Sequence, residues 1–172
     1  MISVVGKKNC GKTTVVVAIA RELVRDGMRV ATLKHGTHGA DIDREGTDTW
    51  RHYHQGQAER VMIEGPGGRA FFQRTDSEED PFTLVRHFMK GTDIVLIEGF
   101  TKHPLPKIEV FRQVEHRKPH FHAKHPMAAH WVAMLSDDAT LDVPFPLFLF
   151  NDTEWLISLK HLALESAAAL ED

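Results

Sequence analysis

The sequence predicts a doubly wound α/β domain with a mostly parallel sheet, and three observations support this fold class. Strand-like and helix-like hydrophobic patterns alternate along most of the 172 residues. Residues 94–97 are apolar at every position, which is typical of a central parallel strand that is buried on both faces. A glycine-rich loop joins the first expected strand, residues 2–5, to the first expected helix, residues 13–25. We therefore expect a parallel sheet covered by helices.

The first part of the chain is expected to alternate between strand and helix. Apolar side chains recur at helical spacing along residues 13–25, and Gly27 is expected to end that helix. Residues 28–33 form the second expected strand, which should be parallel to the first because a helix connects the two. A polar loop at residues 34–46 and a short helix at residues 47–55 follow.

A β-hairpin is expected in the middle of the chain. Residues 58–64 and 69–74 read as strands on either side of the turn sequence GPGG. A two-stranded ribbon has edges to cover and is unstable alone, so packing against a second subunit is expected. We interpret the hairpin, about residues 58–74, as an insertion in a single domain that spans residues 1–172.

The second part of the chain returns to the α/β pattern. Pro81 follows an acidic stretch and is expected in the first turn of a helix that runs to about Lys90. Asn151 and Glu154 resemble a capping box at the start of the last helix. The remaining strands are expected at residues 94–97, 108–111, 131–135 and 147–150, with a loop-rich insertion at about residues 101–126.

Composition narrows the class of protein. The apolar content of 42% suits one globular domain with one core. A net charge of −3 offers no basic footprint for nucleic acid, so no nucleic-acid partner is expected. The single cysteine, Cys10, excludes an intrachain disulfide and fits a reducing compartment. No apolar run approaches the roughly 20 residues of a membrane span. We expect a soluble, cytoplasmic protein without a membrane partner.

Residues 6–14 read GKKNCGKTT and match the phosphate-binding pattern G-x-x-x-x-G-K-[ST] through Gly6, Gly11, Lys12 and Thr13. Glycines let successive backbone N–H groups turn toward a polyphosphate, and the start of the following helix adds positive potential. Lys12 is expected at the β- and γ-phosphates, and the Thr13 hydroxyl at Mg²⁺. The sequence therefore predicts a nucleotide site in a fold of the P-loop NTPase type. The expected nucleotide contacts include the other loop residues, Lys7, Lys8, Asn9, Cys10 and Thr14.

An acidic residue, Glu98, ends the apolar strand at residues 94–97. Ligands gather at the carboxyl ends of the strands in open α/β sheets, so Glu98 is expected to hold Mg²⁺ or its waters. Mg²⁺ takes only one or two carboxylates, so few acids suffice. Gly99 is expected to bring a backbone N–H near the γ-phosphate. The alternative is that Glu98 merely ends the strand.

A second polar block, KHGTHGADID, follows the expected strand at residues 28–33. Lys34 and His35 are expected to contact phosphate oxygens or a second substrate. Asp41 and Asp43 are expected to act on Mg²⁺, directly or through water. Catalytic roles for His35 or His38 stay open. A transition-metal site made of these two imidazoles without thiolates is a weaker alternative.

Together these segments resemble the MobB family, the molybdopterin-guanine dinucleotide biosynthesis protein B. The resemblance covers nearly the whole chain, through GKKNCGKTT, LKHGTHGADID, GTDTWRHYHQGQA, LIEGFTKHPLPKIEVFR, HWVAMLSDD and FNDTEWL. It implies a GTP-binding, weakly GTP-hydrolysing homodimer that assists the guanylyltransferase MobA when GMP is joined to the molybdenum cofactor, with molybdopterin as a further possible ligand. It also implies a phosphate site at residues 6–14, a Mg²⁺ and γ-phosphate pair at Glu98 and Gly99, and a mouth lined by Lys34, His35, Asp41 and Asp43.

Two basic residues invite hypotheses about hydrolysis. Lys7 directly follows the first glycine, where dimeric ATPases similar to MinD carry a lysine that reaches a phosphate in the opposite subunit. The alternative for Lys7 is a solvated side chain. No residue stands out as a base for the attacking water, which fits slow turnover, and Arg112 or a partner's arginine is a candidate to complete the site.

Guanine selection has no familiar motif, because N-K-x-D is absent from the sequence. Asp137 follows an expected strand and is our first candidate to accept the guanine N1–H and N2–H₂ groups. The pair Asn151 and Asp152 is the alternative.

Two other functions remain open. A small-molecule kinase would use the same phosphate loop, but the candidate lid at residues 112–118 is not distinctive. A nickel or zinc chaperone would use a histidine-rich stretch, which we otherwise interpret as a solvated, pH-responsive loop. Its histidines are His116, His120, His122, His125 and His130.

Overall fold

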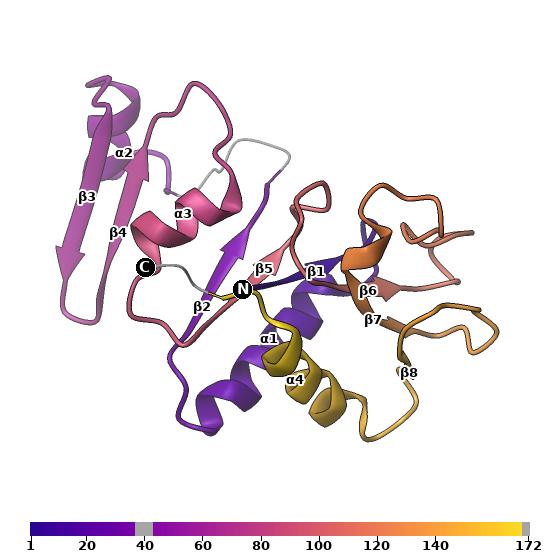
Figure 1. The fold of residues 1–172 in the computed structure, drawn as a ribbon. Helices are drawn as coiled ribbons and strands as arrows, with labels where there is room; N and C mark the ends of the chain where they lie inside the picture. The colour runs from indigo at the N-terminus through magenta and orange to yellow at the C-terminus, as the bar shows by residue number, and fades with distance from the viewer. Residues whose placement is uncertain (37–42, 170–172) are drawn as a thin grey trace. The chain divides into compact units, whose positions relative to one another are not determined.

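A computed structural model describes residues 1–36 and 43–169 of the chain (Figure 1). Two compact units are present. The larger unit consists of Met1–His35 and Asp80–Asp172, and the smaller one of Gly36–Glu79. No helix in the described part of the chain is both long and apolar enough to cross a membrane.

The larger unit is built on a six-stranded sheet with the strand order β2-β5-β1-β6-β7-β8. Every neighbouring pair of these strands is parallel, which confirms the doubly wound, mostly parallel sheet expected from the sequence. The strands are β1 Ile2–Val5, β2 Val30–Lys34, β5 Ile94–Glu98, β6 Lys107–Phe111, β7 Trp131–Ser136 and β8 Leu147–Leu149.

Helices cover both faces of this sheet. The helices are α1 Lys12–Arg25, α3 Pro81–Phe88 and α4 Trp155–Ser166. Figure 1 shows α1 and α4 side by side, and both contribute to one core cluster with Ile94 and Leu96. The alternate residues Val95 and Ile97 pack with Val85 of α3 in a second cluster. Because successive side chains of a strand point to opposite faces, the all-apolar β5 fills both clusters. Each buried Ile or Leu contributes about 1.5–3 kcal/mol.

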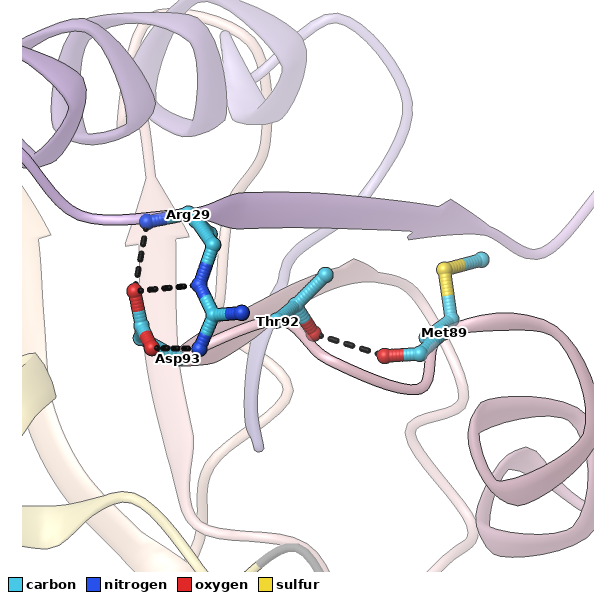
Figure 2. Close-up of polar contacts among 4 residues, drawn as sticks. All are labelled: Arg29, Met89, Thr92 and Asp93. Carbon is cyan, nitrogen blue, oxygen red and sulfur yellow. Dashed lines mark hydrogen bonds and ion pairs between the residues drawn. The ribbon is translucent and has the colours of Figure 1, made fainter.

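The amino ends of β2 and β5 are joined by an ion pair (Figure 2). The Arg29 N–H donates to Asp93 Oδ2 at 2.7 Å, and Arg29 Nη2 donates to Asp93 Oδ1 at 2.7 Å. These hydrogen bonds lower the pKa of the Asp93 carboxyl. Thr92 Oγ1 donates to the Met89 carbonyl at 2.8 Å and closes the turn after α3. Since the Arg29 backbone bonds to Asp93, β2 begins at Val30 rather than at residue 28.

The smaller unit contains α2 Asp48–His54 and an antiparallel hairpin of β3 Arg60–Gly65 and β4 Gly68–Gln73. The hairpin confirms the expectation from the sequence. Val61 lies opposite Phe72, whose ring centroid is 6.4 Å from that of Tyr53 in α2. The next pair, Met62 and Phe71, points to the other face of the ribbon, because alternate residues of a strand face opposite sides.

The expected cap at Asn151 is wrong. Helix α4 begins at Trp155 with Glu154 as the N-cap residue, and Glu154 makes no side-chain cap. The Glu154 N–H instead donates to Asp152 Oδ1 at 2.9 Å. Asp152 therefore closes a side-chain turn before the helix, and this turn moves the helix start three residues beyond the position that a capping box from Asn151 requires.

Candidate phosphate-binding site

The glycine-rich loop lies between β1 and α1, at the carboxyl end of the sheet. Three of its residues have left-handed backbone angles: Gly6 with φ 147°, Asn9 with φ 65° and Gly11 with φ 92°. A Cβ atom on Gly6 would lie 2.3 Å from the carbonyl oxygen of Val110 in the adjacent strand β6. Only glycine fits there, because the loop leaves β1 in direct contact with β6.

Consecutive amide groups of this loop fit an anion. Within residues 1–36 and 43–169, the N–H groups of Lys8, Asn9, Cys10 and Gly11 have no hydrogen-bond acceptor. Gly11 is the N-cap residue of α1 and has no side chain to cap it, so the start of this 14-residue helix keeps its positive potential. Successive unpaired N–H groups beside a helix N-terminus form a nest for phosphate oxygens.

Lys12 and Cys10 support the loop in different ways. Lys12 Nζ donates to the Lys7 carbonyl at 2.8 Å, so the ammonium group lies against the loop rather than in solvent. Cys10 is fully buried and belongs to the core cluster beneath α1. Its small side chain fills the space under the loop, and a nucleotide contact by Cys10 stays a prediction.

Thr13 and Glu98 are brought together from α1 and β5. The Thr13 hydroxyl donates to Glu98 Oε2 at 2.8 Å. Lys34 Nζ, at the end of β2, lies 3.4 Å from the other carboxylate oxygen, Oε1. The Glu98 side chain is only 12% exposed. A hydroxyl and a carboxylate at one strand end are hard oxygen ligands of the kind that Mg²⁺ uses.

Gly99 and His35 lie directly beside this carboxylate. The Gly99 N–H donates to the Val4 carbonyl at 3.0 Å, so contact with a γ-phosphate requires that this bond be exchanged, and the role stays a prediction. The His35 N–H donates to the Glu98 carbonyl at 2.9 Å. The His35 ring is 4.6 Å from the ring of Phe100, whose φ of 53° is unusual for an aromatic residue. Backbone strain of this kind clusters at functional sites.

The remaining acidic candidates are Asp41 and Asp43. Asp41, like His38, lies outside the described residues. Asp43 belongs to the smaller unit, where its Oδ1 accepts from the Arg44 N–H at 2.8 Å and from Thr47 Oγ1 at 3.1 Å. Hydrogen bonds, led by the one from Thr49, lower the pKa of Asp43. A role for Asp43 on a metal stays a prediction.

Asp137 lies at the carboxyl end of β7 and is exposed. Its Oδ1 accepts from the Gln113 N–H at 2.6 Å. Asp138, the buried neighbour, accepts from Gln113 Nε2 at 3.0 Å, and its hydrogen bond with Thr140 lowers its pKa. The carboxylates of Asp137 and Asp138 therefore have different environments. Asp138 fixes the loop, while Asp137 is held at one oxygen and faces solvent.

Sequence reasoning missed the partner of Arg112. The Arg112 guanidinium lies over the Phe150 ring, 3.8 Å from its centroid, and thereby links the ends of β6 and β8. Arg112 Nε is 3.9 Å from the position of a Cβ atom on Gly11. A cationic, flat surface therefore stands beside the phosphate loop. The only sign of this contact in the sequence was an arginine and an aromatic residue that each lie at the end of an expected strand.

The histidine-rich stretch differs from the solvated loop expected from the sequence. His116, His120 and His125 are partly buried, and burial lowers the pKa of the latter two. His116 Nε2 is hydrogen-bonded to the Lys8 carbonyl at 2.7 Å. Among the residues that the structure describes, no three potential ligands converge as a metal site would require.

Known proteins resemble this chain along most of its length. The family model of molybdopterin guanine dinucleotide synthesis protein B (MobB) matches residues 1–137. The molybdopterin-guanine dinucleotide biosynthesis adapter protein of Haemophilus influenzae is 33% identical over 120 residues, which span 69% of this chain and 66% of that protein. A probable adapter protein of the same description from Bacillus subtilis is 30% identical over 158 residues, covering 77% and 90%. The crystal structure of Bacillus subtilis MobB matches with a TM-score of 0.69 and 25% identity, over 98% of each chain.

Proposed function

The chain belongs to the MobB family, and we propose that it binds GTP with Mg²⁺, hydrolyses it slowly and acts as an adapter in molybdopterin guanine dinucleotide biosynthesis. One observation carries the proposal. A nest of unpaired amides from Lys8 to Gly11 lies next to a paired hydroxyl and carboxylate, Thr13 and Glu98. A triphosphate and its metal need both of these features.

Different residues of the chain would bind different parts of the Mg²⁺–GTP complex. The loop amides and Lys12 would bind phosphate oxygens, which requires Lys12 Nζ to leave the Lys7 carbonyl. Thr13 and Glu98 would hold Mg²⁺, whose chemical contribution is to neutralise charge on the phosphates. Lys34 adds positive charge beside Glu98, at 3.4 Å. Catalysis in such a site is positional and electrostatic.

Slow hydrolysis is supported by the positions of two basic residues. Arg112 is held on the Phe150 ring, and Lys7 Nζ donates to the Lys118 carbonyl of the same chain at 2.6 Å. An arginine supplied to the phosphates accelerates related enzymes by about 10³- to 10⁵-fold. A reach of Lys7 into a second subunit requires that its bond to Lys118 break first.

The base would lie beyond the phosphates, at the ends of β6 to β8. The proposed Mg²⁺ ligands, Thr13 and Glu98, lie on the β5 side of the loop, so an extended nucleotide would place its base on the other side. Asp137 is exposed there and has one oxygen fixed by Gln113, which suits a carboxylate that accepts the N1–H and N2–H₂ groups of guanine. The flat Arg112 guanidinium offers a surface for stacking.

A homodimer formed through the hairpin is part of the proposal. Met62 is 56% exposed and Phe71 is 38% exposed, and they form one cross-strand pair. Partly exposed apolar side chains on one face of a ribbon favour burial against a second copy. Static light scattering of the wild type and of Met62→Lys tests this. A dimer that becomes monomeric in the variant supports the interface, and a monomeric wild type contradicts it.

The adapter role predicts a nucleotide-dependent contact with the guanylyltransferase MobA of the same pathway. The test is surface plasmon resonance between immobilised MobA and this chain loaded with GTP or GDP. A difference of at least about fivefold in Kd between the two states supports an adapter that responds to hydrolysis. Absence of binding in both states contradicts the role. The single, buried Cys10 supports a reducing, cytoplasmic location.

A further inference from the structure

A segment between β6 and β7 lies against the outside of the phosphate loop. We name residues 113–121 the brace. It contacts two consecutive residues of the loop: Lys7 Nζ donates to the Lys118 carbonyl at 2.6 Å, and His116 Nε2 donates to the Lys8 carbonyl at 2.7 Å. The brace therefore runs along the loop in antiparallel order.

The far end of the brace is held by a buried carboxylate, Glu109 of β6, which is 1% exposed. Its oxygens accept three hydrogen bonds: from the His120 N–H at 2.5 Å, the Phe121 N–H at 2.9 Å and Trp131 Nε1 at 2.8 Å. Hydrogen bonds to an ionised group contribute about 1.5–3 kcal/mol each. Because Glu109 extends from a central strand, the brace is fixed to the sheet itself.

The start of the brace is fixed as well. The backbone N–H and the side chain of Gln113 donate to Asp137 and Asp138 at 2.6 Å and 3.0 Å. One end of the brace is fixed to Glu109 within β6 and the other to the residues that follow β7, so the middle of the brace has little freedom to move away from the loop. This matters for His116, which lies near that middle.

The bond from His116 has a consequence for the anion nest. A trans peptide directs its C=O and N–H groups to opposite sides, and the structure contains no cis peptide in its described residues. The Lys8 carbonyl is bound by His116 on the brace side, so the Asn9 N–H of the same peptide is turned away from the brace. Asn9 also has the left-handed φ of 65°, a conformation that costs free energy without support from its surroundings.

We propose that His116 and Glu109 are positioning residues of the phosphate loop. His116 sets the Lys8–Asn9 peptide so that its N–H is available to phosphate, and Glu109 keeps the brace where His116 can do this. The proposal rests on the nucleotide-binding function above and extends it. Preorganised donors bind an anion more tightly because they need not be ordered on binding. Affinity for the polyphosphate therefore depends on the brace, while selection of the base does not.

The test is calorimetric titration of His116→Ala with GTP, ITP and inorganic tripolyphosphate. We expect a loss of about 3- to 10-fold for all three ligands, the equivalent of one hydrogen bond. The ratio of GTP to ITP affinity stays that of the wild type. His116→Gln, whose side-chain amide can donate from a similar position, restores most of the affinity. The control is His122→Ala, an exposed histidine beyond the brace, which binds all three ligands like the wild type.

Glu109→Gln provides a second variant, since it removes the charge and weakens the set of three acceptor bonds. We expect the same selective loss, and we expect His116→Ala to add little in the double variant because both act through one contact. If His116→Ala binds GTP and tripolyphosphate as tightly as the wild type, the inference is overturned while the nucleotide-binding function stands. A wild type that binds neither ligand overturns the function itself.

Discussion

The Thr13 hydroxyl donates a 2.8 Å hydrogen bond to Glu98 Oε2, although 85 residues separate the two in the chain. Their meeting follows from the fold, because β1 and β5 are parallel neighbours and both end at the same edge of the sheet. Thr13 is the second residue of the helix after β1, and Glu98 is the last residue of β5. This pair is the basis of the proposed metal site.

The Thr13–Glu98 pair predicts a specific magnesium dependence. Thr13→Ala removes the hydroxyl ligand but leaves the loop amides and Lys12 in place. We expect GTP to bind Thr13→Ala with the same affinity in Mg²⁺ and in EDTA, whereas Mg²⁺ tightens wild-type binding by about tenfold or more. Titrations in both buffers measure this. Thr13→Ser keeps the hydroxyl and should retain the magnesium effect. A full magnesium effect in Thr13→Ala would exclude this residue as a ligand.

Gly6 predicts a sharp difference between two glycine substitutions. A Cβ atom at Gly6 would approach the Val110 carbonyl oxygen to 2.3 Å, whereas at Gly27, also left-handed with φ 84°, nothing lies within 4 Å. Gly27→Ala should lower the free energy of unfolding by about 1 kcal/mol through backbone strain alone. Gly6→Ala should cost several times more and abolish GTP binding, because the loop must move away from β6. Urea unfolding of both variants compares them, and equal destabilisation would contradict this role of the loop's contact with β6.

Asp137 predicts how the base is selected. ITP lacks the N2 amine of guanine, so a carboxylate that accepts from this amine favours GTP over ITP. Asp137→Asn retains an oxygen to accept from the Gln113 N–H but loses the charge. We expect the GTP/ITP affinity ratio to fall by about 5- to 10-fold, measured by competition with a fluorescent nucleotide. Asp142→Asn, at another exposed carboxylate, is the matched control. Equal discrimination in Asp137→Asn and the wild type would leave Asn151 and Asp152 as candidates.

Lys107 predicts a rise of stability at alkaline pH. It is fully buried, donates to the His103 and Leu105 carbonyls, and burial lowers its pKa from the ordinary 10.5 to about 8. Between these two values the unfolded chain binds more protons than the folded one. The free energy of unfolding therefore increases with pH through this window, by at most about 1.4 kcal/mol per pH unit.

The measurement for Lys107 is urea unfolding at about pH 7.5 and about pH 9.5. The wild type should gain about 1–2 kcal/mol relative to Lys107→Met over this interval, because only the wild type has this buried amine to deprotonate. The comparison between the two proteins removes the contribution of other titrating groups. The same pH dependence in both would show that the amine of Lys107 titrates normally.

The sequence predicted those features of the fold that depend on local patterns. Periodicity revealed β5 as a strand buried on both faces, and the GPGG turn revealed the hairpin. The predicted starts of β2 and α4 were wrong, because in each case a carboxylate side chain bonds to the backbone next to the expected start. Asp93 holds the backbone of Arg29 outside β2, and Asp152 displaces the start of α4 from Asn151. Such bonds depend on residues that a hydrophobic pattern does not register.

The candidate site also contains features that the sequence predicts and features that it does not. The phosphate loop and Glu98 were predictable, because a motif and a strand end each place a residue at the sheet's carboxyl edge. The brace was not predictable. The side chains of His116 and Glu109 bond to backbone groups, and Lys118 contributes only its carbonyl. Because every residue has such backbone groups, the sequence does not mark the partners of these contacts. The stacking of Arg112 on Phe150 likewise depends on the separation of β6 and β8 in space.

The most direct test of the central claim, that the loop after β1 holds the phosphates of GTP, is an equilibrium titration of Lys12→Ala with GTP in Mg²⁺. We expect saturable binding to the wild type and to Lys90→Ala, a control at an exposed lysine beyond the end of α3. In Lys12→Ala we expect the affinity for GTP to fall by at least about 100-fold. Wild-type affinity in Lys12→Ala, with the variant folded by circular dichroism, would contradict the claim.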